Sequence, residues 1–165
     1  MKKKQILLCS CKKENKNGFL VLSLDLEKKE KEILEYFYET NNFEPGCIYQ
    51  ISNVENNNPI NGKIDNKKNI NINETEFFMV GGFDPDKRIG IIKLYKIQFN
   101  KNDRIIKIKN LVDIGEEDKE NNFKGFDSKI TCITQSKITG NLVINSLDGN
   151  INLFRPPNLE CFMRK

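Results

Sequence analysis

The stretch that decides the fold is Asn141–Phe154, which reads NLVINSLDGNINLF. Apolar and polar residues alternate on both sides of Asp148-Gly149, and Asp-Gly between two such runs is a strong signal for a β-hairpin. Two earlier stretches have the same design: Gln5–Leu26 reads QILLCSCKKENKNGFLVLSLDL, and Phe77–Ile97 reads FFMVGGFDPDKRIGIIKLYKI. The hairpins recur at intervals of roughly 70 residues, which indicates an internal repeat.

Alternation of apolar and polar residues predicts ten short strands along the chain. A charged turn is expected at Cys11–Asn17, and Asn41-Asn42 with Pro45-Gly46 indicate another turn. Pro156-Pro157 ends the last strand because proline has no N–H for a sheet. The run EKKEKEILEY before Phe37 also contains good helix formers, so a helix start is the alternative there. The predicted strands are Ile6–Ser10, Phe19–Leu26, Ile33–Thr40, Cys47–Val54, Glu76–Gly82, Gly90–Asn100, Arg104–Ile114, Lys129–Ser136, Asn141–Leu147 and Asn150–Arg155.

Ten sequential strands joined by short loops predict an all-β fold, an antiparallel β-meander. Four-strand units in series are typical of propeller-type blades. Ten strands are too few for four such blades, and propellers usually need at least four. We therefore expect the chain to form an incomplete ring. Leu159–Met163 is expected to add the outer strand of the last blade, whereas we expect no segment before Ile6 to supply the inner strand of the first.

Residues 123–154, FKGFDSKITCITQSKITGNLVINSLDGNINLF, resemble a WD-repeat blade. Gly125-Phe126 stands where that family has Gly-His, Asp148-Gly149 matches the turn between its second and third strands, and Phe154 stands where its Trp lies. The resemblance implies a β-propeller of the scaffold type, with Phe154 in an aromatic socket. The buried His–Ser/Thr–Asp–Trp network of the family cannot form, because this chain has no His and no Trp.

We therefore expect a single partial propeller domain over residues 1–165. It holds a partial blade at 5–40, a full blade at 46–114 with a flexible insertion at 55–74, and a C-terminal WD-like blade at 123–165. The insertion contains eight Asn and shows no period, and a stretch of this kind is usually a surface insertion.

The net charge of +4 is mildly basic, and four Arg stand against 23 Lys. Lysines are mixed with Glu, whereas a nucleic-acid surface usually gathers its cations with Arg and aromatic residues on one element. Solvated surface lysines are thus the favoured interpretation. Phosphate binding by Lys2–Lys4, Lys12, Lys13 and Lys124 is the alternative, and its affinity would fall steeply with salt.

The five cysteines are expected to be free thiols, because the apolar run after Met1 is too short for a signal peptide. We expect a cytoplasmic protein, with the nucleus as the alternative. Cys9 and Cys11 lack the two further ligands that a zinc site needs, so no metal is expected.

No catalytic site is expected, because the absence of His removes the usual nucleophile pairs and general base. No Gly-rich phosphate loop is present, and no cofactor is expected. Asp84-Pro-Asp86 begins like a calcium loop but lacks the further acidic ligands, so a tight turn is favoured. A hydrolase that uses only carboxylates is the remaining enzymatic alternative.

The expected function is that of a non-catalytic scaffold for protein–protein interaction, with self-association or ring completion through open blade edges as a further expectation. Strand alternation puts several loops at one end of the sheets, and rigid sheets presenting loops commonly form binding surfaces. Phe83 and Phe126 are the expected apolar anchors. The polar members of the expected surface are Asp84, Asp86, Lys87, Arg88, Asp127 and Lys129.

Overall fold

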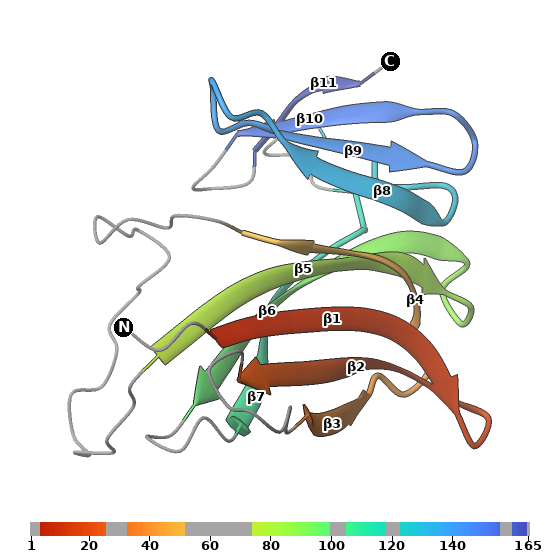
Figure 1. Cartoon of the computed structure of the whole chain (residues 1–165). Helices are drawn as coiled ribbons and strands as arrows, with labels where there is room; N and C mark the ends of the chain where they lie inside the picture. The colour runs from red at the N-terminus through yellow and green to blue at the C-terminus, as the bar shows by residue number, and fades with distance from the viewer. Residues whose placement is uncertain are drawn as a thin grey trace, which may run out of the picture.

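The computed structural model describes residues 4–25, 33–51, 74–99, 105–117, 123–155 and 160–164. These residues form three antiparallel sheets, none of them closed, that lie in layers (Figure 1). The all-β antiparallel meander predicted from the alternation of apolar and polar residues is confirmed.

The first sheet has the order β1-β2-β3, with β1 at Lys4–Lys13, β2 at Lys16–Asp25 and β3 at Ile33–Glu39. The turn between β1 and β2 is only Glu14-Asn15, with φ angles of 49° and 65°. Two consecutive positive φ angles are the signature of the type I′ turn, which matches the twist of a hairpin. The predicted turn at Cys11–Asn17 is therefore too long, because both strands continue through the charged residues.

The second sheet has the order β4-β5-β6-β7, with β4 at Glu44–Gln50, β5 at Glu74–Asp84, β6 at Ile89–Phe99 and β7 at Ile105–Ile114. The turn predicted between Asn41 and Gly46 forms at Asn41-Asn42, where Asn41 has a φ of 55°. The prediction that Pro45-Gly46 belongs to this turn is wrong, since these residues lie inside β4, at a bulge opposite Gly82 and Gly81. Proline is tolerated there because β4 is an edge strand. Of the expected insertion, residues 55–73 lie outside the described residues, as do residues 52–54, while Glu74 begins β5.

The third sheet has the order β11-β10-β9-β8, with β8 at Ile130–Gln135, β9 at Leu142–Ser146, β10 at Ile151–Arg155 and β11 at Glu160–Arg164. The prediction that Leu159–Met163 supplies an outer strand is confirmed by the pairing of β11 with β10. The strand predicted at Asn141–Leu147 ends one residue early, and Leu147 lies in the following turn.

The second sheet is the centre of the fold, because it is buried on both faces. One face packs on Phe19 and Val21 of β2 through residues that include Phe78 and Tyr95. The opposite face, with Met79 and Leu94, packs on the third sheet through a separate core. This explains why β6 reads as a nearly continuous apolar run, as strands covered on both sides do.

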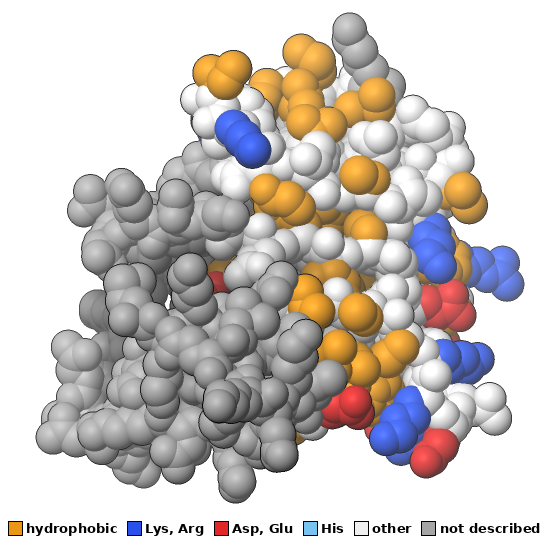
Figure 2. Space-filling model, viewed as in Figure 1, with side chains coloured by type: hydrophobic (Ala, Val, Ile, Leu, Met, Phe, Trp, Pro, Cys, Tyr) orange, Lys and Arg blue, Asp and Glu red, His pale blue; other side chains and the backbone are white. Residues whose placement is uncertain are grey.

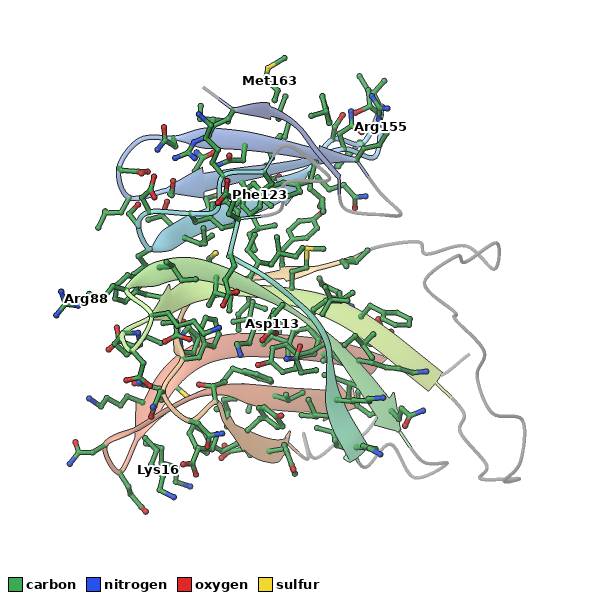
Figure 3. All side chains as sticks on the ribbon, turned by 180° about the vertical axis from the view of Figure 1, so that it is seen from behind. Lys16, Arg88, Asp113, Phe123, Arg155 and Met163 are labelled. Carbon is green, nitrogen blue, oxygen red and sulfur yellow. The ribbon has the colours of Figure 1, made fainter. Side chains whose placement is uncertain are left out.

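Aromatic rings fill both cores. The Phe19 ring lies 5.1 Å from that of Tyr95 and 5.2 Å from that of Phe78. In the other core, the Phe123 ring lies 4.8 Å from Phe126 and 5.4 Å from Phe154. Figure 3 shows Phe123 between the second and third sheets. Offset and edge-on ring contacts of this kind add to the stabilisation from burial.

Candidate functional site

One end of the sheets carries hairpin turns from all three of them, and we call it the turn end (Figure 1). It is the end at which the sequence placed the candidate interaction residues. The segments that form it are Glu14-Asn15, Thr40–Phe43, Asp84–Arg88, Gly115–Glu117, Gly125–Lys129 and Ser146–Asn150.

The β5–β6 turn is closed by the side chain of Asp84. Its Oδ1 accepts hydrogen bonds from the backbone N–H groups of Asp86 and Lys87, at 3.0 and 3.1 Å. Short Asp side chains favour turns in this way because they replace backbone partners. The turn ends at Arg88, whose φ is +56°. Figure 3 shows Arg88 pointing away from the body of the molecule.

Neighbouring segments hold this turn from both sides. The amide of Asn42 donates a hydrogen bond to the carboxylate of Asp86. On the other side, the Lys87 ammonium forms an ion pair with Glu116, and this hydrogen bond raises the pKa of Lys87. Arg88 is exposed and has no hydrogen bond or ion pair to any residue that the structure describes. A fixed turn thus presents one unpaired guanidinium.

Gly90 joins the second sheet to the segment that leads into the third. Its N–H donates to the carbonyl of Phe126 at 3.0 Å, and the Phe126 N–H donates to the carbonyl of Gly115 at 3.1 Å. A Cβ at position 90 would lie 2.0 Å from the Ser128 carbonyl oxygen, so only glycine fits there. The approach of these backbones fixes the spacing between the β5–β6 turn and the loop before β8.

Phe126 is a correction to the expected surface. Its side chain is 2% exposed and lies in the core between the second and third sheets. It therefore cannot serve as an apolar anchor for a partner. Phe83, the other expected anchor, is partly exposed and pairs with Gly90 in the sheet.

Asp127 and Lys129 lie beside Phe126 at the turn end. The carboxylate of Asp127 forms an ion pair with Arg164 of β11 at 2.9 Å, and Arg164 also donates to the Gly125 carbonyl oxygen at 3.3 Å. Lys129 is partly exposed, and its backbone carbonyl accepts a hydrogen bond from the Leu147 N–H at 2.8 Å. Asp127 is thus already engaged within the chain.

The β9–β10 turn is organised around Asp148. Its carboxylate accepts hydrogen bonds from the Ser146 hydroxyl at 2.6 Å and from the Asn150 N–H at 3.2 Å. These donors, Ser146 first, hold the pKa of Asp148 at about 2, below its ordinary 3.8. Gly149 has a φ of +85°, which an L side chain would adopt only with strain.

Leu147 is the apolar residue at the turn end that the sequence did not single out. Its side chain is 71% exposed although its backbone is tied to Lys129. A large apolar side chain directly before Asp148-Gly149 was the available signal, because turn positions are usually polar. Glu116 and Asn42 were missed as well, since their roles depend on contacts between distant segments.

The remaining expected structural residue, Phe154, is 1% exposed and lies in the core beneath the third sheet. Figure 2 shows the charged side chains gathered along the edge formed by the turns, while hydrophobic side chains are spread over the third sheet. The turn end is therefore the strongly charged edge of this view.

Within the described residues, no three His, Cys, Asp or Glu side chains come together as metal ligands. The same residues include no helix of the length and apolar character needed to cross a membrane. Comparisons with protein-family models, with curated proteins and with solved structures find no match to this chain.

Proposed function

We propose that this protein is a non-catalytic scaffold, similar in architecture to a diverged WD-repeat propeller, and that its turn end binds a partner protein. The proposal is supported by a sheet order in which each strand pairs with its neighbour in sequence, as in propeller blades. It also draws on the Asp148-Gly149 turn and on Phe154 at the position of the family's Trp.

The binding proposal rests mainly on the backbone conformation and the exposure of Arg88. A non-glycine residue with positive φ is strained and is found more often at functional sites. This Arg is also exposed and unpaired within the described residues, although its neighbour Lys87 forms an ion pair with Glu116. Arg is over-represented among the residues that dominate protein interfaces, because its planar donors bind carboxylates in pairs.

Leu147 supplies the apolar contact that Phe126 cannot. Its exposed side chain and the Arg88 guanidinium lie on turns that are tied to the same segment, through Lys129 and through Gly90 respectively. Because the backbones of both turns are held in place, binding has to order only the two side chains, which favours affinity. The partner surface that fits them has a carboxylate beside an apolar pocket.

The test is retention of partner proteins from a cell extract by immobilised wild-type protein and by Arg88→Glu. Loss of a hot-spot residue costs at least about 2 kcal/mol, or roughly 30-fold in affinity, so the specific partner should be lost. Lys107→Glu is the matched control, because Lys107 is exposed on β7, away from the turns. This control should retain the same partner as the wild type.

Two outcomes would contradict the proposal. One is a set of retained proteins that is identical for wild type and Arg88→Glu. The other is retention that disappears after nuclease treatment and falls steeply with salt, which would favour the alternative of phosphate binding through lysines.

A further inference from the structure

The two outer sheets carry apolar side chains on both faces. Antiparallel sheets that face water on one side normally alternate apolar residues inward with polar residues outward. Here the first and third sheets each bury one face against the second sheet. Their opposite faces also carry several apolar side chains, together with charged ones such as Glu35 and Arg155. Within the described residues, each end of the stack is a sheet face that no other sheet covers.

On the third sheet, the register defines the outward face. In β10, Asn152 and Phe154 are buried, so Ile151 and Leu153 point outward. Met163 pairs with Leu153 and projects from the sheet in Figure 3. Ile151 and Met163 are 41% and 44% exposed. We call this surface the β10 face, and it consists of Cys132, Thr134, Val143, Ile151, Leu153 and Met163.

On the first sheet, Phe19 and Val21 of β2 point to the core, so Leu20 and Leu22 point outward. Leu20 pairs with Cys9 and with Phe37, and Leu22 pairs with Leu7. We call this surface the β2 face, and it includes Leu7, Cys9, Leu20, Leu22 and Phe37, with Glu35 beside Leu22.

The two faces carry opposite charges at the same end of the stack. Arg155 follows Leu153 at the end of β10 far from the turn end, and Glu35 pairs with Leu22 at the corresponding end of the first sheet. Both are exposed. Arg155 lies over the Phe162 ring, 5.1 Å from its centre, and neither Arg155 nor Glu35 has an ion pair with a side chain that the structure describes. Consider the first sheet of a second copy stacked on the third sheet of this one, with the turn ends of both copies on the same side. Arg155 on the β10 face then lies at the same end of the contact as Glu35 on the β2 face.

We propose that copies of this chain associate head to tail, with the β10 face of one copy packed on the β2 face of the next. This contact repeats the sheet-on-sheet packing that the chain already makes on both sides of its second sheet. Contacts between two different surfaces close into rings or continue as filaments. Rings of radial β-sheets hold about four to eight sheets, and two copies of this chain provide six. The expected assembly is a closed dimer.

The test is the solution mass of the full chain, measured by sedimentation, with one Asp placed on each face. Wild type should be dimeric, whereas Leu153→Asp and Leu20→Asp should each be monomeric, because burying an unpaired carboxylate in an apolar contact is unfavourable. An equimolar mixture of these two variants should form a heterodimer, since each retains the face that the other has lost. Leu147→Asp, at the turn end, should stay dimeric.

Thiol labelling adds an independent readout. Cys9 lies on the β2 face and Cys132 on the β10 face, and both are exposed in the isolated chain. In the heterodimer, the intact β2 face of Leu153→Asp meets the intact β10 face of Leu20→Asp. Cys9 of Leu153→Asp and Cys132 of Leu20→Asp should therefore be protected from labelling. Cys132 of Leu153→Asp and Cys9 of Leu20→Asp should react. Circular dichroism should show that both variants remain folded.

A monomeric wild type would overturn the proposal and would mean that another protein or segment covers these faces. A dimer that tolerates either Asp substitution, or a mixture that stays monomeric, would also overturn the head-to-tail contact. The turn end takes no part in the head-to-tail contact. Failure of the proposed dimer would therefore leave the proposed binding of a partner protein at the turn end untouched.

Discussion

Replacing Phe154 by Ala tests whether the core between the second and third sheets holds the fold together. The side chain is 1% exposed, and its ring centre lies 5.4 Å from that of Phe123 and 6.1 Å from that of Phe126. Truncating a buried Phe to Ala costs about 3–5 kcal/mol through lost burial and the cavity left behind. For a chain of this length, 4 kcal/mol corresponds to a fall of about 8–16 °C in Tm.

The assay is urea and thermal unfolding followed by far-ultraviolet circular dichroism, since the chain contains no Trp. Phe162→Ala is the matched control, because Phe162 lies on the neighbouring strand and is 41% exposed. Its ring lies 5.1 Å from the Arg155 guanidinium, and an exposed contact of this kind contributes about 0.5–1 kcal/mol. Equal losses of stability for the two variants would refute the placement of Phe154 in a core that the fold requires.

Two further substitutions test the turn end. Because the pKa of Asp148 is lowered from 3.8 to about 2, its ionised form stabilises the fold above about pH 4, and this stabilisation is lost as the pH falls through 2. The difference in Tm between wild type and Asp148→Asn should therefore shrink from pH 5 to pH 2, and a constant difference would contradict the assignment. Gly90→Ala should destabilise the protein by about 1–3 kcal/mol through overpacking, because the added Cβ would lie 2.0 Å from the Ser128 carbonyl oxygen. Gly140→Ala is the control, because its Cβ meets nothing closer than 3.9 Å and its cost is limited to backbone strain at a φ of +72°. A smaller loss of stability for Gly90→Ala than for Gly140→Ala would contradict the close packing at Gly90.

The hairpins were predictable from sequence because their signals are local. Asp148-Gly149 and the alternating residues around it specify β9 and β10 without reference to the rest of the chain. The continuous apolar run in β6 likewise indicates a strand covered on both faces. These patterns were sufficient for the fold class and for the order of the strands.

The boundaries and the site depended on contacts between segments. The bulge at Pro45-Gly46 forms because β4 pairs with β5, and the sequence around Pro45 alone reads as a turn. Phe126 is buried because its backbone bonds to Gly90 and Gly115, which lie 36 and 11 residues earlier in the chain. Alternation cannot show such contacts, so Phe126 was expected on the surface, and the exposed Leu147 was placed at the end of a strand.

The three sheets stack face to face, and the second sheet is covered on both sides. Nuclear Overhauser effects between protons of different sheets test this stacking most directly. We expect one set between the rings of Phe19 and Tyr95, whose centres are 5.1 Å apart. We expect another between an Ile130 methyl group and the α-protons of Gly81, since a Cβ at position 81 would lie 2.5 Å from Ile130 Cγ2. A folded protein that shows the hairpin contacts within each sheet but neither of these sets would contradict this stacking.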